Sequence, residues 1–154
     1  MVRLFTADAY FKSVFEIDLP ALKRLGKTVL AIDLDNTLAS YAILEPTEQI
    51  LAFLKAAEEL GFTVIICSNN NKSRVRHFSK DINAVAHHHC LKPLPFKVAY
   101  VLRGYKRCEI VVIGDQIRTD ILAAKLLGVY SILVDSIEDP NHWIENLIKR
   151  FVNN

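Results

Sequence analysis

The sequence predicts an α/β fold with a parallel five-stranded sheet and helices on both of its faces. After residue 27, short apolar runs rich in β-branched residues alternate with helix-like runs, a pattern typical of a parallel sheet wrapped by helices. The first apolar run, residues 28–32, shows no alternation of apolar and polar residues, as expected for a strand buried on both faces. A chain of 154 residues can form one domain with a substantial core, and we expect residues 1–154 to do so.

The remaining elements follow in order along the chain. Apolar residues at helical spacing predict a helix over 47–60, which Gly61 would end. Pro95 suits the first turn of a helix, and the apolar spacing near the C-terminus predicts an amphipathic closing helix over 141–151. The other expected strands are 63–67, 84–87, 109–113 and 130–134, and the other expected helices are 72–80, 95–102 and 120–127.

The first 27 residues are predicted to be an appendage packed on the core, with a short helix over 19–25. The aromatic side chains of this segment are expected in the core. Because several basic residues lie among them, the alternative is that the segment docks on an anionic bilayer surface. The aromatic residues are Phe5, Tyr10, Phe11 and Phe15, and the basic residues are Arg3, Lys12, Lys23 and Arg24.

Composition and charge argue against several classes of protein. A formal net charge of +2 gives no reason to expect a nucleic-acid partner, and no apolar run approaches the roughly 20 residues of a membrane-spanning helix. The N-terminus lacks the apolar segment of a signal peptide. Three cysteines without CxxC spacing are expected to be buried thiols in a reducing compartment. The sequence therefore predicts a cytoplasmic protein and leaves its oligomeric state open.

Polar side chains follow four of the predicted strands, at the point where each strand ends. In an open parallel sheet, ligands bind beyond the carboxyl ends of the strands, so these side chains are expected to meet there. Two carboxylates at the end of a buried strand are costly unless a cation or a reaction requires them. In chain order the residues are Asp33 and Asp35, then Ser68, Asn69 and Asn70, then Lys92, and finally Asp115 and Asp120.

Together these residue types suit phosphoryl transfer. A phosphate monoester is doubly negative near neutral pH, so a site must neutralise it and position the attacking group. Mg²⁺ bound by carboxylate oxygens, with one lysine, would neutralise the phosphate. A carboxylate nucleophile would divide hydrolysis into two steps through an aspartyl-phosphate.

The motifs resemble those of the haloacid dehalogenase-like (HAD) phosphatases. The segment 33–37, Asp-Leu-Asp-Asn-Thr, is similar to their DxDxT signature, and Ser68, Lys92 and the segment 114–120 stand where the later motifs of that superfamily fall. More narrowly, the chain resembles the YqeG-type group of subfamily IIIA, which is similar to phosphatidylglycerophosphate phosphatases. The resemblance implies a three-layer Rossmann-like HAD fold.

The resemblance also implies catalytic and substrate-binding roles. Asp33 would attack phosphorus, and Asp35 would protonate the leaving oxygen and then take a proton from the attacking water. Ser68 and the backbone N–H of Asn69 would hold the transferring phosphoryl group, with Thr37 bracing the loop.

The implied cation site is for Mg²⁺. Its ligands would be Asp33, the backbone carbonyl of Asp35, and Asp115. Asp120 would bind metal-ligated water or orient Lys92, the lysine that stabilises the phosphate.

Alternatives stay open at three positions. Lys97 lies five residues past Lys92 and is the other candidate for the phosphate-stabilising lysine, although Pro95 is expected to open the helix that carries it. Asp120 could instead cap its helix. The histidines at 87–89 alternate in direction along a strand and cannot easily share a metal, so we expect them at an exposed edge near the substrate approach.

HAD enzymes, which the chain resembles, select substrates with cap insertions after the first motif or between the second and third, and the chain lengths there predict an enzyme without a cap. Residues 38–46 leave room for a flap, and residues 71–91 hold only elements of the core. Capless enzymes act on large substrates that cover the site themselves, or rely on a partner. The phosphorylated substrate could be a lipid headgroup, a protein, a nucleic-acid end or a soluble metabolite. The resemblance favours phosphatidylglycerophosphate and, with it, a peripheral position at the inner face of the membrane.

Two other classes of protein are considered. A receiver-like signalling module also surrounds an aspartyl-phosphate with acids, but its acids follow the first and third strands, whereas here they follow the first and fourth. A binding protein could keep the same fold without catalysis. Nucleotide-dependent classes find no support, because the chain has neither a GxxxxGK[ST] loop nor GxGxxG after a strand.

Overall fold

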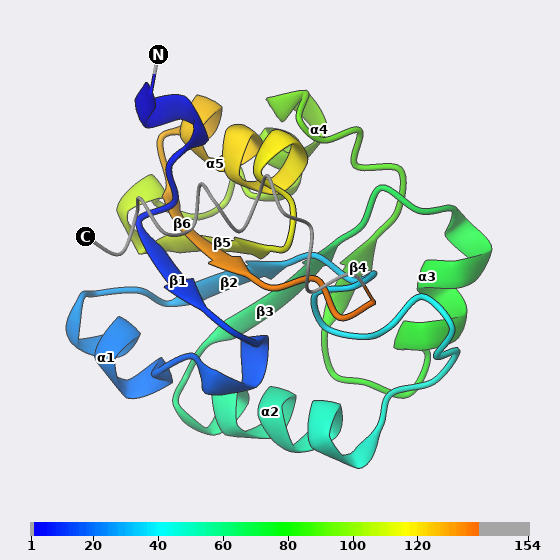
Figure 1. Cartoon of the computed structure of the whole chain (residues 1–154). Coiled ribbons are helices and arrows are strands. Elements are labelled where there is room, and N and C mark those ends of the chain that lie inside the picture. The colour runs from blue at the N-terminus through cyan, green and yellow to red at the C-terminus, as the bar shows by residue number, and fades with distance from the viewer. Residues whose placement is uncertain (1, 139–154) are drawn as a thin grey trace.

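The computed structural model describes residues 2–138 and contains a sheet of six strands, in which every neighbouring pair is parallel (Figure 1). The order across the sheet is β1-β6-β5-β2-β3-β4, so β2 is central and β1 and β4 are the edges. The strands are β1 (Ala9–Phe11), β2 (Val29–Ile32), β3 (Thr63–Cys67), β4 (Val85–His87), β5 (Ile110–Gly114) and β6 (Tyr130–Val134).

Helices cover both faces of the sheet, which confirms the predicted three-layer arrangement. Successive residues of a strand point to opposite faces, so the side chains of β2 contribute alternately to two cores. Leu30 and Ile32 belong to one core, and Val29 and Ala31 to the other. The first core is covered by α1 (Leu19–Arg24), α2 (Glu48–Glu59) and α3 (Lys72–Ser79), and the second by α4 (Pro95–Val101) and α5 (Leu122–Leu127).

The prediction of five strands is wrong by one, because the N-terminal segment supplies β1. Ala9 pairs with Ile132 of β6 at the edge of the sheet. This strand has only three residues, all of them half-buried, so it lacks the continuous apolar run that marks the central strands. Phe11 and Phe15 pack against the first core as predicted, and Phe15 meets Phe53 of α2 edge-on at a ring-centroid distance of 5.9 Å. Phe5 is exposed, so the prediction that it lies in the core is wrong.

The strands over 63–67 and 130–134 have the predicted bounds, and the other predicted elements within the described residues differ from their predicted bounds by one or two residues at one or both ends. Thr47 caps α2 by accepting a hydrogen bond from the backbone N–H of Ile50, and Gly61, with φ +82°, follows the end of that helix. A π-helical turn, Ile117–Ile121, precedes α5, so the predicted helix over 120–127 is regular only in its second part. The expected closing helix over 141–151 lies outside the described residues. Within residues 2–138, no helix is long and apolar enough to span a membrane.

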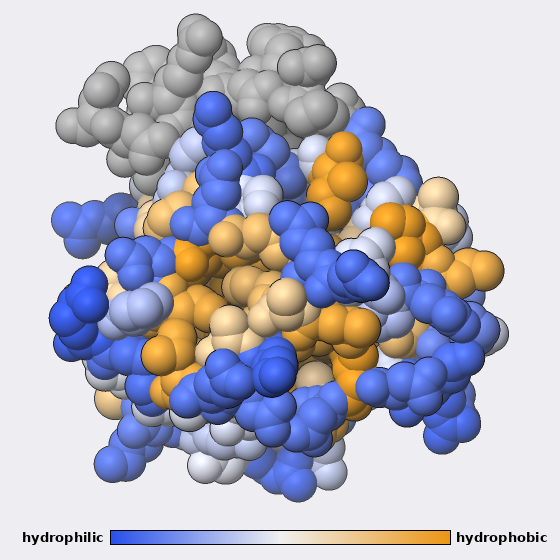
Figure 2. Space-filling model, turned by 90° about the horizontal axis from the view of Figure 1, so that it is seen from below, coloured by the Kyte–Doolittle hydropathy of each residue, from blue (hydrophilic) through white to orange (hydrophobic). Residues whose placement is uncertain are grey.

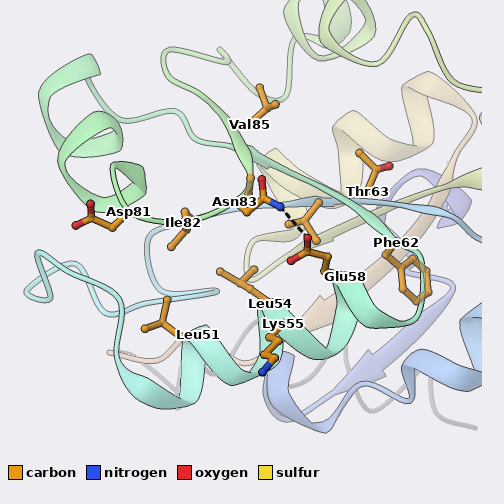
Figure 3. Close-up of a pocket in the computed structure, with 12 residues that line it drawn as sticks. Leu51, Leu54, Lys55, Glu58, Phe62, Thr63, Asp81, Ile82, Asn83 and Val85 are labelled. Atoms are coloured by element: carbon orange, nitrogen blue, oxygen red, sulfur yellow. Dashed lines mark hydrogen bonds between the residues drawn. The ribbon is translucent and has the colours of Figure 1, made fainter.

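A cavity of about 540 Å³ lies beside α2, between that helix and the segment that leads into β4 (Figure 3). Asn83 donates a 2.8 Å hydrogen bond to Glu58 within its lining. The side of the molecule on which α2 lies has hydrophobic surface around a hollow, bordered by hydrophilic residues (Figure 2). The cavity is lined by Thr63 and Val85, the first residues of β3 and β4. It is therefore at the amino ends of these strands, whereas the predicted site residues follow the carboxyl ends.

Candidate active site

Loops that follow four adjacent strands meet at one edge of the sheet. The strands β5, β2, β3 and β4 are consecutive neighbours and run in the same direction, so their carboxyl ends lie together. Asp33 directly follows β2, Ser68 follows β3, and Asp115 follows β5. Lys92 lies in the loop between β4 and α4. The parallel topology therefore brings together residues that are far apart in the sequence.

Lys92 is the cation at the centre of this edge. Its Nζ donates to Asp33 Oδ1 at 2.9 Å, to Asp120 Oδ1 at 2.6 Å and to the carbonyl oxygen of Cys67 at 2.7 Å. These three acceptors use all three N–H groups of the ammonium, which is buried. The structure thus brings Lys92 to the acidic residues, whereas Lys97 donates to the carbonyl oxygen of His88.

Asn69 fixes the backbone that carries Lys92. Its Nδ2 donates to the Lys92 carbonyl oxygen at 2.9 Å, and its Oδ1 accepts from the Lys92 backbone N–H at 2.8 Å. The neighbouring Ser68 is buried, unlike the exposed Asn69, and its Oγ accepts from the N–H of Asn70 at 3.0 Å. The loop after β3 therefore braces the lysine loop, a contact between side chain and backbone that the sequence did not predict.

Three carboxylates gather around Lys92. Asp33, Asp115 and Asp120 each offer one oxygen, and these oxygens lie within 4.8 Å of one another. The Thr37 hydroxyl is 3.1 Å from Asp33 Oδ2 and 3.0 Å from Asp115 Oδ1. A hydroxyl has one proton, so Thr37 can donate to only one of the two carboxylates at a time. The repulsion between the acids is therefore only partly relieved.

Electrostatics within this cluster shift several pKa values. Burial, and then the charge of Asp120, raise the pKa of Asp33 to about 6. Burial, followed by the charges of Asp120 and Asp33, raises the pKa of Asp115 to about 8. Burial alone would lower the pKa of Lys92, but Asp120 and Asp33 raise it above its ordinary value. The ammonium is therefore fixed in its charged form, but its single positive charge does not neutralise the three carboxylates around it.

This shortage of positive charge suits a bound cation. The side-chain atoms of the cluster that could bind a metal ion are all carboxylate oxygens, which are the ligands that hard divalent cations such as Mg²⁺ prefer. Within residues 2–138, Asp33, Asp115 and Asp120 are the acidic, histidine or cysteine side chains whose spacing fits a metal ion. The donor set therefore fits the cation that the sequence predicts.

Gly114 allows Asp120 to reach the cluster. A Cβ atom at position 114 would lie 2.2 Å from Asp120 Cγ, closer than any two such atoms can approach. Asp120 lies inside the π-helical turn, and its Oδ2 accepts from the backbone N–H of Gln116 at 3.2 Å. Because α5 begins at Leu122, Asp120 is not the N-cap residue of that helix.

Asp35 makes a different set of contacts. Its Oδ1 accepts from Arg74 Nη2 at 3.1 Å and Nε at 3.2 Å, and its Oδ2 accepts from Asn70 Nδ2 at 2.8 Å. Its carboxylate is therefore not one of the three in the cluster. β2 ends at Ile32 and Asn36 has φ +63°, so the alternation of an extended strand does not continue through Asp35.

Arg74, on α3, also binds the flap over residues 38–46. Its guanidinium donates to the carbonyl oxygens of Ile43 and Ser40 as well as to Asp35. The sequence assigns no role to Arg74, because nothing in the predicted helix over 72–80 distinguishes this arginine from the other basic residues of the helix. The flap itself contains no helix or strand, and α3 is the only regular element between β3 and β4, as expected for a capless arrangement.

The fold and the acidic cluster define an α/β protein with a candidate metal site at the carboxyl ends of its parallel strands. Residues 5–128 match the model of the haloacid dehalogenase-like hydrolases, and the chain belongs to this family. It is 31% identical to the probable phosphatase YqeG of Bacillus subtilis (strain 168) over 144 residues, which cover 92% of this chain and 84% of that protein. This similarity supports a phosphatase within the hydrolase family.

A solved structure has the same fold. It is the crystal structure of an uncharacterized protein from Listeria monocytogenes serotype 4b, with a TM-score of 0.58 and 14% sequence identity. The similarity covers 80% of this chain and 99% of the other. At this low identity the comparison confirms the fold alone.

Proposed function

We propose that this protein is a Mg²⁺-dependent phosphomonoester hydrolase that works through an aspartyl-phosphate on Asp33. The observation that carries the proposal is the position of Asp33, which is bonded to Lys92 and Thr37 and lies beside Asp115 and Asp120. A carboxylate held next to a buried ammonium is fixed in place, and the same ammonium attracts a dianionic phosphate.

The proposed reaction has two steps. In the first, a carboxylate oxygen of Asp33 forms a bond to phosphorus while the bond to the leaving oxygen breaks, and Asp35 gives that oxygen a proton. In the second, water attacks phosphorus and gives a proton to Asp35, the bond to Asp33 breaks, and inorganic phosphate leaves. The sum is a monoester plus water giving an alcohol plus phosphate.

Other residues of the site bind the cation and the phosphoryl group. Asp33, Asp115 and the backbone carbonyl of Asp35 would hold Mg²⁺, with Asp120 binding metal-ligated water or orienting Lys92. When bound, the cation supplies the positive charge that the three carboxylates lack and that the phosphoryl oxygens require. Ser68 and the backbone N–H of Asn69 would hold the transferring group.

The proposed substrate is a phosphate on a large molecule, in particular the headgroup phosphate of phosphatidylglycerophosphate. Supporting this choice, the flap over 38–46 contains no helix or strand, and the segment between β3 and β4 contains only the 72–79 helix. In the described part of the chain the site therefore has no cap domain, which suits a large substrate. The resemblance to the YqeG-type group points to the same lipid. The protein would then work as a peripheral protein at the inner face of the membrane.

Turnover by an Asp33→Asn variant tests the chemistry. We expect this variant to lose Mg²⁺-dependent hydrolysis of p-nitrophenyl phosphate while its circular dichroism stays like that of the wild type. Undiminished turnover by a folded Asp33→Asn variant would overturn the proposal. Stable labelling of the wild type by acetyl phosphate without turnover would instead indicate a receiver-like module.

A substrate screen tests the lipid assignment separately. It compares phosphatidylglycerophosphate micelles with sugar phosphates, nucleotides and phosphopeptides in the presence of Mg²⁺. We expect the highest kcat/KM with the lipid. A clear preference for a small soluble phosphate would refute the lipid assignment and leave the two-step chemistry intact.

A further inference from the structure

Positive charge is concentrated in one segment of the chain. Residues 61–108 contain nine lysine or arginine residues and one acidic residue, Asp81, which gives this segment a net charge of +8. The whole chain carries +2, so the other residues together carry −6. The small total charge thus conceals a strong separation of charge along the sequence.

The fold places this basic segment at one edge of the sheet. It comprises β3, the edge strand β4, and the helices α3 and α4, which lie on opposite faces of the sheet. The loop between β4 and α4 carries Lys92, so the basic segment borders the candidate active site. Within it, Lys80 and His77 pair with Glu45 of the flap.

Large apolar side chains are exposed beside the same loop. The exposed fractions are 59% for Leu91, 55% for Leu94, 76% for Phe96 and 65% for Tyr100. Leu91 and Leu94 flank the active-site lysine, and Phe96 and Tyr100 are four residues apart on α4, so they share its outer face. The inner face of α4 is occupied by Val98, which is buried in the second core.

Basic side chains from both helices surround this apolar group. Helix α3 contacts β4, and Lys97 of α4 donates to the carbonyl oxygen of His88, just after β4 ends. Consistent with this, burial and then nearby positive charges, those of Lys97, Lys72 and Arg76 among them, lower the pKa of His88. Lys72 and Arg76 come from α3 and Lys97 from α4. We define the apolar–basic rim by these seven residues: Leu91, Leu94, Phe96, Tyr100, Lys72, Arg76 and Lys97.

We propose that the apolar–basic rim docks the protein on the surface of an anionic phospholipid bilayer. Apolar side chains that enter the boundary between headgroups and acyl chains, with lysine and arginine beside them, are the combination that binds such surfaces. Within residues 2–138, six of the seven rim residues are exposed, and Lys97 is half-buried with its Nζ bonded to the carbonyl oxygen of His88. Two aliphatic leucines favour a bilayer over a nucleic acid, which would be bound by aromatic stacking and phosphate contacts.

Docking in this way would present the active site to the membrane. Lys92 lies between Leu91 and Leu94, so insertion of these two side chains brings the phosphate-binding edge to the level of the headgroups. The claim that docking brings the active site to its substrate rests on the proposed function. Binding of the rim to the bilayer does not depend on that function. The two can therefore fail separately.

Vesicle sedimentation of the full-length chain tests the proposal. The probes are vesicles of phosphatidylcholine alone and of phosphatidylcholine mixed with phosphatidylglycerol. We expect the wild type to sediment with the mixed vesicles and not with the neutral ones at about 0.1 M salt, and to be released as salt shortens the Debye length. Equal binding to both kinds of vesicle, or binding to neither, would overturn the proposal.

Matched variants locate the binding surface. We expect Leu94→Ser/Phe96→Ser and, separately, Lys72→Glu/Arg76→Glu to reduce partitioning by about tenfold or more. The controls are Leu25→Ser/Leu126→Ser, which removes two other exposed leucines, and Arg24→Glu/Lys55→Glu, which makes the same change in net charge on α1 and α2. The controls are expected to bind like the wild type. Equal losses in rim and control variants would place the binding elsewhere.

Two further measurements separate this proposal from its alternatives. Hydrolysis of p-nitrophenyl phosphate, which needs no membrane, is expected to stay unchanged in all four variants. Loss of vesicle binding with full hydrolysis therefore supports the rim, whereas vesicle binding by a chain without phosphatase activity would overturn only the proposed function. Binding to single-stranded RNA that exceeds vesicle binding and depends on the same residues would reassign the rim to nucleic acid.

Discussion

Arg74 and Asp35 form an ion pair in which Nη2 and Nε of the guanidinium lie 3.1 and 3.2 Å from the same carboxylate oxygen. Both side chains are largely shielded from solvent, and the guanidinium also binds the carbonyl oxygens of Ser40 and Ile43 in the flap. The pair thus joins α3, the flap and the proposed acid/base. We therefore regard Arg74 as a positioning residue that acts through Asp35.

The dependence of the reaction on the leaving group can test this role. A poor leaving group needs a proton from the acid, whereas p-nitrophenolate does not. We expect Arg74→Gln to lower kcat for an alkyl phosphate about tenfold or more, and to lower kcat for p-nitrophenyl phosphate much less. Arg76→Gln, a change of an exposed arginine on the same helix, should affect neither substrate. Equal losses for both substrates would mean that Arg74 supports only the fold.

Lys92 should be essential to both catalysis and stability. Its replacement by methionine leaves Asp33 and Asp120 buried without their shared partner, and breaking such a pair costs about 3–5 kcal/mol. We expect Lys92→Met to abolish measurable turnover and to lower the free energy of unfolding in urea. Lys97→Met is the control, because Lys97 bonds only to the backbone of His88 among its described contacts. Loss of turnover in the Lys97 variant but not in the Lys92 variant would contradict the assignment of Lys92 as the lysine that stabilises the phosphate.

Gly114 should tolerate no side chain. The added methyl group of Gly114→Ala would collide with the carboxylate of Asp120 and push it away from Lys92. We expect a loss of about tenfold or more in kcat and weaker Mg²⁺ activation, since small displacements of catalytic groups are costly. Gly104→Ala has no atom within 4 Å of the new Cβ and should behave like the wild type. Full activity of the Gly114 variant would show that Asp120 need not occupy its present position.

The carboxylate cluster should make the metal-free protein less stable at higher pH. The pKa of Asp33 rises in the folded protein from 3.8 to about 6, and that of Asp115 rises from 3.8 to about 8. Between these values the folded protein holds protons that the unfolded chain has lost, so the free energy of unfolding falls as pH rises. The stabilisation from protonation is complete below pH 3.8 and is lost as pH rises through about 6 and 8.

Urea unfolding of the metal-free protein at pH 5.5 and 8.5 measures this effect. We expect the wild type to lose about 2 kcal/mol or more between the two values. Mg²⁺ should restore stability at pH 8.5, because it binds only the folded carboxylates. Asp115→Asn should flatten the dependence, and Glu59→Gln, a change of an exposed acid on α2, should not. If the metal-free wild type were more stable at pH 8.5 than at pH 5.5, repulsion among the three carboxylates could not be the source of the pH dependence.

The residues that follow the central strands could be located from the sequence. Asp33 and Asp115 follow apolar runs that are buried on both faces, and parallel topology dictates that the ends of such strands meet. Pro95 correctly marks the start of α4, which places Lys97 on that helix and leaves Lys92 in the loop. These conclusions needed only periodicity and chain direction.

Other features depend on tertiary contacts that no local pattern encodes. β1 was missed because three half-buried residues at an edge carry no periodic signal. The partners of Asp35 follow from the turn at Asn36 and from the face of α3 that carries Arg74, and neither can be read from neighbouring residues. The reciprocal hydrogen bonds between Asn69 and Lys92 likewise join residues 23 positions apart.

Trapping the covalent intermediate tests the central claim most directly. The wild type is mixed with p-nitrophenyl phosphate and Mg²⁺, quenched with acid, reduced with borohydride and digested for mass spectrometry. Reduction converts an aspartyl-phosphate to homoserine, and we expect homoserine at position 33 and nowhere else. An unmodified Asp33 during active turnover, or homoserine at Asp35, Asp115 or Asp120 instead, would contradict the account.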